Sequence, residues 1–491
     1  MNFQYPDLLA ILGYLTIVTA IGLYAGRSRD SKDFFLGGKS LHWTAIMLSI
    51  IATETSSLTF LNVPGISYYE DYAFLQLAFG FILGRVVVSI LILPMYYKSG
   101  YTSIYEWIGE KFGKSSQKYT SAIFLITRVL SDGVRLYATS IPVALILSSI
   151  LDNKFSDFQI SILTLFLITF ITLLYTVYGG FRSVVFTDVI QFIVYIGGGV
   201  FSLVYIYSNL NPNLNISQIY HKLSESGKLT IFRGFQGEFF TSTYYFVNAI
   251  FAGILISIGS HGVDQMFAQR LLACNTERES RLALIGSGIL VFFQFLLFLM
   301  IGSLLFIHYG NSTENQTKVF SMYIIQNIPS PILGLLVAAV LASAMSTLSS
   351  SINSMSLSFL IDFRGQDSNS NTLAQSKYTS FLWGIVLFLS SLLPYYLSER
   401  YQGGLVDLGL RITSFTFGPM IGIFLLGKWK RELIVSPVYL NSSIAISIFF
   451  TMCISYFFTV ALFFLIPIGM TIFFVLIFLF HGNQFDSNDF Y

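Results

Sequence analysis

The feature that most constrains this chain is a succession of long apolar segments separated by short polar ones. A helix needs roughly 20 apolar residues to cross a bilayer, and about thirteen segments reach that length. They lie near residues 7–25, 42–63, 72–97, 119–151, 159–178, 184–208, 239–262, 282–308, 331–358, 379–396, 403–427, 436–457 and 459–480. Only 11% of the 491 residues are charged, against about a quarter in a soluble domain. The sequence therefore predicts an all-α membrane protein with about thirteen transmembrane helices.

The distribution of basic residues predicts the orientation of the chain. An odd number of spans puts the termini on opposite sides, and cytoplasmic loops carry an excess of Lys and Arg. With the N-terminus outside, most of the 27 Lys and Arg residues, Arg270 among them, fall in cytoplasmic segments. The external segments then carry only Lys154, Lys222, Lys228, Arg233, Lys318 and Arg400. We expect a multi-pass protein of the cell membrane (plasma or inner), with its N-terminus outside and its C-terminus in the cytoplasm.

Charge and motifs argue against several other classes of protein. The net charge of +2 gives no reason to expect a nucleic-acid partner. The chain has no phosphate-binding loop, its five histidines lack metal-ligand spacing, and no nucleophile–base pair stands out, so we expect no enzyme. The expected partners are the lipid bilayer, an ion whose gradient supplies the energy, and a small-molecule substrate. A sodium-independent exchanger, a channel and a transporter-like sensor remain alternatives.

The second apolar segment is interrupted by polar residues at its centre. The stretch from Ala52 to Ser57 reads ATETSS and includes Glu54. A helix facing lipid would not tolerate these groups, whereas hydroxyls can satisfy the backbone of a helix that unwinds around a binding site. The alternative is an intact helix whose hydroxyls bond back to its own carbonyls. The glutamate favours the broken helix.

The ninth segment carries a run of hydroxyl side chains from Ala342 to Ser354. Small residues let helices approach closely, which is the structural explanation for such a run. However, Ser346, Ser349 and Ser350 follow the spacing i, i+3, i+4 and therefore share one helical face. A cluster of hydroxyl oxygens suits a hard cation such as Na⁺ better than a soft metal.

Two further segments contain ionisable residues at membrane depth. Asp188 lies in the first turns of the sixth segment, where an unpaired carboxylate is costly and needs a cation or a hydrogen-bond donor. In the fourth segment Asp132 and Arg135 stand three residues apart and can pair along one helix. Alternatively, Arg135 or Arg128 presents a guanidinium to a substrate carboxylate or to substrate hydroxyls.

Four motifs, taken together in this order, resemble the sodium:solute symporter family, which includes sodium/glucose, sodium/proline and sodium/sialic acid carriers. The motifs are Asp33-Phe34-Phe35-Leu36-Gly37-Gly38-Lys39-Ser40-Leu41, Tyr178-Gly179-Gly180 leading to Thr187-Asp188, Asp264-Gln265 with Gln269-Arg270, and the serine run ending in Asn353-Ser354. The resemblance implies a LeuT-like fold, in which two inverted repeats of five helices bind substrate and ions near the midplane. It implies one transporter domain with an extra N-terminal helix (7–25), a first repeat (42–208), a second repeat (239–427) and two appended helices (436–480).

The resemblance also implies sodium sites. One lies between the second and ninth segments, with backbone carbonyls from Ala52 and Thr55 and hydroxyls from Ser346 and Thr347. Some members, the sialic acid carriers among them, have a second site, and the residues that match it here are Asp188, Ser346, Ser349 and Ser350. We therefore expect two Na⁺ ions, one of which would supply the cation that Asp188 needs.

For the substrate, the resemblance implies a smaller set of residues. Ser56 and Thr59 match hydroxyls that hold the sialic acid carboxylate in its carriers, and Gln76 matches a substrate amide. Glu54 could pair with Arg135, contact a substrate amine or polyol, or take a proton. We expect a sodium-coupled symporter that imports a small polar solute (a sialic acid, a sugar or a carboxylate-bearing molecule) by alternating access and that functions as a monomer.

Overall fold

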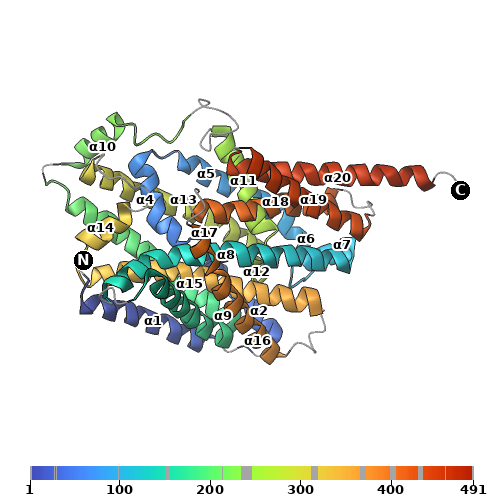
Figure 1. The fold of residues 1–491 in the computed structure, drawn as a ribbon, viewed down its shortest axis with the longest axis horizontal. Helices are drawn as coiled ribbons and strands as arrows, with labels where there is room; N and C mark the ends of the chain where they lie inside the picture. The colour runs from blue at the N-terminus through green and yellow to red at the C-terminus, as the bar shows by residue number, and fades with distance from the viewer. Residues whose placement is uncertain are drawn as a thin grey trace.

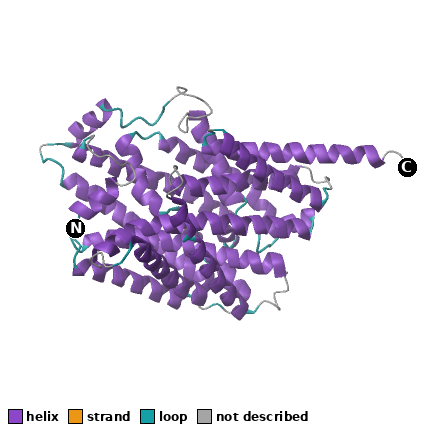
Figure 2. Ribbon diagram, viewed as in Figure 1, coloured by secondary structure: helices purple, strands orange, loops and turns teal. Residues whose placement is uncertain are grey.

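In a computed structural model of the protein, the described part of the chain consists of helices joined by loops (Figure 2). The description covers residues 3–488 except 27, 29, 98, 151–154, 213, 234–245, 311–318, 365–371, 399–404, 430–434 and 459. Lys154, Lys318 and Arg400, which helped to orient the chain, lie outside the described residues. The all-helical prediction is confirmed for the part that is described.

The described chain forms the helices α1 to α20 and the short helical turns η1 to η4. The first part forms α1 (Tyr5–Ala25), α2 (Ser31–Leu36), η1 (Gly37–Lys39), α3 (Trp43–Glu54), α4 (Ser57–Tyr69), α5 (Phe74–Val87), η2 (Val88–Ile92), α6 (Leu93–Tyr97), α7 (Tyr105–Phe112), α8 (Lys114–Ile150) and α9 (Asp157–Ser208). The second part forms α10 (Ile216–Glu225), α11 (Phe246–Gly262), α12 (Gln265–Leu272), α13 (Glu277–Tyr309), α14 (Val319–Asn327), α15 (Ile332–Ser358), η3 (Phe359–Arg364), α16 (Leu373–Ser390), α17 (Leu393–Ser398), α18 (Leu405–Trp429), α19 (Pro437–Phe457), η4 (Leu462–Phe464) and α20 (Leu465–Asn488).

Each predicted apolar segment overlaps at least one of these helices. Within the described residues, nine helices are long and apolar enough to cross a membrane, or up to eleven if each of two bent helix pairs is one span. One of those pairs is α11 with α12, which meet at a bend of 64°. From the sequence, this span was predicted to end at the bend, and α12 was assigned to a cytoplasmic loop. The total of thirteen spans stays a prediction.

The fifth and sixth predicted segments form one long element, α9, that is broken inside. A straight helix of its 52 residues would extend about 78 Å, far more than the roughly 30 Å of a hydrocarbon core. Gly180 interrupts the helix with φ 61° and ψ −155°, a conformation open almost only to glycine. A side chain there would also meet the Phe34 carbonyl oxygen at 2.6 Å. Gly180 therefore divides α9 into two helices.

The N-terminal helix α1 packs closely against α9. A Cβ placed on Gly26 would come within 1.9 Å of the Gly179 Cα, so the two backbones touch. Gly22 and Gly26 stand four residues apart on one face of α1, the spacing by which small residues bring helices together in membranes. At the other end of α1, the buried carboxylate of Asp7 accepts a hydrogen bond of 2.7 Å from the Gly334 backbone N–H of α15.

The serine-rich helix α15 lies at the centre of the bundle. It packs against α8, α9, α1 and α16, and 89% of its most apolar stretch is buried, more than in any other candidate span of the described chain. Every residue from Ala342 to Ser354 is buried. The hydroxyl run therefore faces protein all round and does not face lipid.

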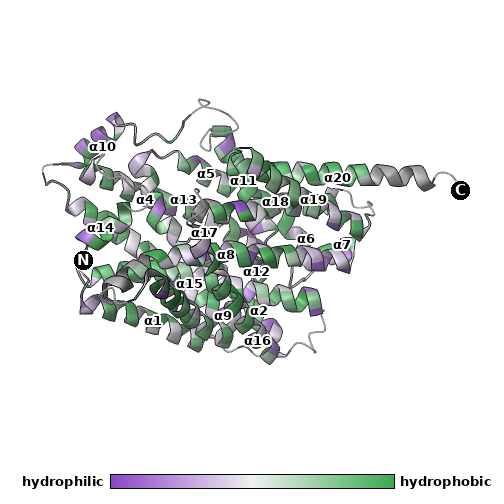
Figure 3. Ribbon diagram, viewed as in Figure 1, coloured by the Kyte–Doolittle hydropathy of each residue, from purple (hydrophilic) through white to green (hydrophobic). Residues whose placement is uncertain are grey.

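The two ends of the molecule carry different loops. The N-terminus lies at one end of the longest axis with α10 and α14, and the C-terminus lies at the other end with α7 (Figure 1). Hydrophobic residues dominate the helices between the ends, and hydrophilic ones are conspicuous on α10 and α7 (Figure 3). The loops that the basic residues assign to opposite sides of the membrane thus lie at opposite ends.

Candidate ion and solute site

The second predicted span is broken at its polar centre, as the sequence analysis favoured. Helix α3 ends at Glu54, Thr55 and Ser56 are extended, and α4 begins at Ser57. Serine is a preferred N-cap residue, and the Ser56 Oγ accepts a hydrogen bond of 3.4 Å from the Thr59 N–H. The chain thus ends one helix and begins another within two residues.

The break exposes backbone carbonyls that face α15. The last carbonyls of a helix have no intrahelical donor, and those at the end of α3 are met by hydroxyls instead. The Ser346 Oγ donates to the Ala52 carbonyl at 2.7 Å, and the Thr347 Oγ1 donates to the Thr53 carbonyl at 3.1 Å. Carbonyl and hydroxyl oxygens therefore converge where the first sodium site was predicted.

A small cavity adjoins these oxygens. It encloses about 170 Å³ and is lined by Ala52, Thr55, Gln191, Phe192, Tyr195, Ser343 and Ser346. The Thr55 hydroxyl is held by the amide of Gln294, to whose Oε1 it donates at 3.0 Å. Three of the four residues predicted for the first sodium site thus share one cavity, and the fourth, Thr347, lines the cavity beside it.

Two of the four residues predicted for a second sodium site, Asp188 and Ser350, contact a different cation, the Arg270 guanidinium. Asp188 is fully buried, and its Oδ2 accepts hydrogen bonds from the Ser49 hydroxyl at 2.5 Å and the Arg270 guanidinium at 3.0 Å. The Ser349 and Ser350 hydroxyls both donate to the Ser346 carbonyl, at 3.1 and 2.6 Å. Arg270 was assigned to a cytoplasmic loop, but α12, which is bent by 64° from α11, is buried in the protein and carries it inside.

A larger polar cavity lies between α4, α8 and α15. Its empty space is about 290 Å³, and it is lined by Ser56, Asp132, Arg135, Leu136, Thr139, Ser343, Ala344, Thr347 and Leu348. The predicted contact between Asp132 and Arg135 is present at 3.8 Å. The side chain of Arg135 lines this cavity and is a quarter exposed.

Glu54 points elsewhere. It forms an ion pair with Arg85 of α5, which is buried and also donates to the Ser287 hydroxyl at 2.6 Å. The His261 Nε2 lies 3.8 Å from the same carboxylate. The pairing of Glu54 with Arg135 that the sequence analysis considered is therefore wrong, because Arg135 contacts Asp132. The ion-pair partner of Glu54 is instead Arg85, on the neighbouring helix α5.

Thr59, Gln76 and Arg128 do not line the polar cavity. The Thr59 N–H donates to Ser56, the N-cap residue of α4, and the Gln76 amide donates to the carbonyl of Ala73, the N-cap residue of its own helix, at 3.3 Å. Arg128 is buried and forms ion pairs with Asp132 and with Asp264, the N-cap residue of α12. Of the two arginines considered for the substrate, Arg135 is the one that faces the cavity.

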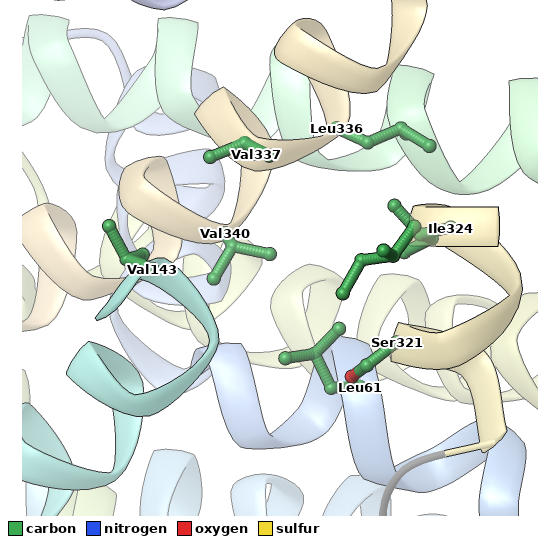
Figure 4. A pocket seen from close by; sticks show the side chains of 8 residues that line it. Leu61, Val143, Ser321, Ile324, Leu336, Val337 and Val340 are labelled. Atoms are coloured by element: carbon green, nitrogen blue, oxygen red, sulfur yellow. The ribbon is translucent and has the colours of Figure 1, made fainter. Parts of the chain in front are cut away.

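An apolar cavity continues the polar one along the same three helices. Figure 4 shows it between Leu61, Val143, Ile324 and residues of α15, and it encloses about 340 Å³. Its lining residues on α4, α8 and α15 are Leu61, Val143, Leu336, Val337 and Val340. On each helix these residues lie nearer than the polar lining to the end of the molecule that carries α14.

Several residues that make contacts in this region were not predicted from the sequence to belong to it. Arg85 and Arg270 each form a buried ion pair, Ser49 bonds Asp188, and Gln294 bonds Thr55. Arg85 could have been found, because it lies inside a predicted span and an ionisable residue at that depth needs a partner. Ser49 and Gln294 are single polar residues in apolar helices and give no comparable signal.

Comparisons with known proteins agree with this architecture. The model of the sodium:solute symporter family matches residues 34–434. The sodium/sialic acid symporter SiaT of Proteus mirabilis is 26% identical over 441 residues, which cover 88% of this chain and 86% of SiaT. The sodium-coupled monocarboxylate transporter 2 of Bos taurus is 25% identical over 476 residues, 91% of this chain and 73% of that protein.

A solved structure has a similar fold. It is the substrate-bound, outward-open state of a Na⁺-coupled sialic acid symporter, and it superposes with a TM-score of 0.84. The match covers 97% of each chain at 24% sequence identity. At that identity the likeness describes the fold, and it extends over nearly every helix.

Proposed function

The chain belongs to the sodium:solute symporter family, and on that premise we propose that it imports a small organic solute bearing a carboxylate. Sodium-coupled solute symport is its activity, and Na⁺ is the coupling ion. The observation that carries the proposal is the shared wall of two cavities. Ser343 lines both the cavity beside Ala52 and Ser346 and the one beside Ser56 and Arg135. Ion and solute would therefore bind against the same stretch of α15.

The carboxylate is inferred from Arg135. A guanidinium binds carboxylates through two parallel hydrogen bonds, and this one is a quarter exposed with an ion-pair contact of 3.8 Å to Asp132. The Ser56 hydroxyl lines the same cavity and can donate a further hydrogen bond. Sialic acids and monocarboxylates, the solutes for which two relatives are named, both carry a carboxylate.

The first sodium ion would bind at the break between α3 and α4. Its ligands would be oxygens of Ala52, Thr55, Ser346 and Thr347, which now satisfy one another or line the same cavities. The ion would replace the hydrogen bonds between the α15 hydroxyls and the α3 carbonyls. Oxygen ligands of this kind suit a hard cation. The second ion would bind Asp188, Ser346, Ser349 and Ser350.

Binding of sodium would organise the solute cavity. Because the first site joins α15 to the break that positions Ser56, an ion there fixes one wall of that cavity. By linkage, the solute must then raise the affinity for sodium by the same factor. Inward movement of each charge across a potential of 100 mV would yield about 2.3 kcal/mol. This energy would drive accumulation by alternating access.

Solute would enter from the end of the molecule that carries α10 and α14. The apolar cavity around Leu61 and Val143 lies on that side of the polar one, and the basic residues assign that side to the outside. We infer thirteen spans, an inverted pair of five-helix repeats and a monomer that is functional by itself. In this arrangement the N-terminus lies outside and the C-terminus in the cytoplasm.

A thermal-shift screen of the purified protein tests the solute class. Sialic acids, short monocarboxylates, sugars and amino acids would each be added with sodium and with choline in its place. We expect carboxylate-bearing solutes to raise the melting temperature only with sodium, and their amides or esters to have no effect. An equal shift from the uncharged analogues would contradict the proposal.

Substitution of Arg135 tests the residue. In Arg135→Gln the sodium-dependent shift by the carboxylate should disappear, because the cavity loses its cation. Arg182→Gln provides the matched control, because Arg182 is partly exposed and contacts the Gly37 carbonyl at 3.2 Å, away from the cavity. A carboxylate response that survives in Arg135→Gln would exclude this residue from solute binding.

A further inference from the structure

Arg270 joins four helices through its guanidinium. It lies on α12 with 1% of its surface exposed. The Nε donates to the Ser49 Oγ at 2.9 Å, and Nη2 donates to the Thr53 Oγ1 at 2.7 Å and to the Asp188 Oδ2 at 3.0 Å. The Ser350 Oγ accepts a further hydrogen bond from Nη2. The guanidinium thus contacts α3, α9 and α15 at one point.

Two of these partners, Asp188 and Ser350, belong to the set proposed for the second sodium ion. Among the described residues, the other partners of Asp188 are the hydroxyls of Ser49 and Thr53, so Arg270 is the charged side chain there that faces it. One carboxylate can neutralise one monovalent cation. A sodium ion bound beside Arg270 would leave a net positive charge in the protein interior, which is costly without a second anion.

We propose that Arg270 is a tethered cation that competes with the second sodium ion for Asp188 and Ser350. This inference rests on the proposed second site and adds the residue that controls its occupancy. While the guanidinium is in place, the protein binds one sodium ion, at the break of α3. The second ion binds only when Arg270 withdraws. The Asp188 Oδ1, which has no hydrogen-bond partner among the described residues, is where that ion first finds a ligand.

The competition would link sodium to the position of α12. This helix is the second half of a span bent by 64°, and all eight of its residues are buried. Besides Arg270, it is held by the Gln269 amide, which donates to the Phe35 carbonyl at 2.5 Å and the Asn353 Oδ1 at 2.6 Å. Displacement of Arg270 by sodium would remove one of the polar contacts that hold α12 in place.

Sodium binding at equilibrium tests the competition without transport. Bound ²²Na⁺ would be counted on the purified full chain in nanodiscs as sodium replaces choline, without solute. At sodium concentrations that saturate the first site, we expect about one bound ion per wild-type protein. Arg270→Gln should approach two ions in that range, with the second binding at least tenfold more tightly than in the wild type. Arg270→Lys, which keeps a cation, should stay near one.

Two further variants keep the test decisive. Arg270→Gln combined with Asp188→Asn should return to one ion, because the carboxylate is gone. If Arg270→Gln does not fold, Ser49→Ala replaces it. Ser49 is outside the sodium set and holds the guanidinium, so its loss should tighten the second ion severalfold. Arg182→Gln should leave the count unchanged.

The outcomes separate this inference from the proposed function. Two ions of equal affinity in the wild type, or an unchanged or lower count in Arg270→Gln and Ser49→Ala, would overturn the competition and leave symport intact. No sodium bound by any variant would refute the proposed sodium sites themselves. Thr347→Ala removes a ligand of the first site alone, and it should lower the wild-type count toward zero.

Discussion

At the scale of single residues, the region around the break of α3 is a set of oxygens that satisfy one another. The carbonyls of Ala52 and Thr53 accept hydrogen bonds from Ser346 and Thr347. A buried hydrogen bond is worth about 1 kcal/mol net, so an ion that supplies stronger interactions can replace it. These hydrogen bonds therefore satisfy the carbonyls at the break while leaving them replaceable by a cation at the proposed sodium site.

Ser346→Ala should weaken sodium binding with little effect on the fold. The variant removes a proposed ligand, and we expect the sodium concentration for half-maximal uptake to rise about tenfold, which corresponds to about 1.4 kcal/mol. The control is Ser356→Ala on the same helix, where the buried hydroxyl bonds only the Ile352 carbonyl within its own helix. A shift of the same size in both variants would mean that Ser346 acts through packing.

Glu54 illustrates how a neighbouring helix determines the role of a residue. The ion pair compensates the charges of both side chains, of which Arg85 is fully buried and Glu54 is partly exposed. The position at the end of α3 suggested contact with a solute, whereas Arg85 and His261 surround it. Glu54 therefore stabilises the junction between α3, α5 and α11.

At the scale of elements, the interruptions of helices are the informative positions. Thr55 and Ser56 separate α3 from α4, Gly180 divides α9, and Val263 and Asp264 separate α11 from α12. An interruption frees carbonyls or N–H groups, and at the first and third of these, side chains satisfy some of them: Ser346 bonds the Ala52 carbonyl, and Asp264 accepts from the Met266 N–H. Two ion pairs lie at or just after the third interruption: Asp264 within it pairs with Arg128, and Arg270 of α12 pairs with Asp188.

Gly180→Ala should destabilise the fold, and Gly197→Ala should not. Alanine at position 180 has to adopt φ 61° and ψ −155° and would meet the Phe34 carbonyl oxygen, at a cost of about 1–3 kcal/mol for the backbone alone. Gly197 lies in the same element with no atom within 4 Å of a Cβ. Alanine there removes the helix cost of glycine, about 1 kcal/mol.

Melting temperatures of the two purified variants provide the measurement. We expect a lower value than the wild type for Gly180→Ala and an equal or higher one for Gly197→Ala. Equal melting temperatures in both variants would show that α9 does not depend on its interruption at Gly180.

At the scale of the whole molecule, the loops divide into two groups at opposite ends. The N-terminus, α10 and α14 lie at one end, and α7 and the C-terminus lie at the other (Figure 1). The polar cavity and the apolar cavity follow each other along α4, α8 and α15 toward the first of these ends. The geometry accordingly favours an access route from the side that the basic residues assign to the outside.

Cysteine labelling in intact cells tests this orientation. Tyr220 of α10 is 60% exposed and Glu110 of α7 is also exposed, so each can carry a cysteine with little effect on packing. We expect a membrane-impermeant maleimide to label Tyr220→Cys in intact cells and Glu110→Cys only after permeabilisation. The wild type, with Cys274 buried and Cys453 partly buried, provides the background. The reverse pattern would invert the proposed topology.

The sequence by itself determined the helical class, the approximate limits of the helices and the place where the second span breaks. The reason is local: a chain in a bilayer must satisfy its backbone within each segment, so the length and polarity of a segment reveal its structure. The hydroxyl run that contains Ser346 and the guanidinium of Arg135 were singled out in the same way, as polar groups in apolar segments, whereas Thr347 was assigned to the sodium site by the family resemblance.

Only the tertiary structure decided which of these groups meet. Arg270 and Asp188 are 82 positions apart, and Glu54 and Arg85 are 31 positions apart. The first pairing depends on the bend that places α12 inside the protein, and the second depends on which face of α5 packs toward α3. Helical periodicity states which residues share a face, but it does not state which face of another helix packs against it. The partners of the buried charges therefore followed from packing alone.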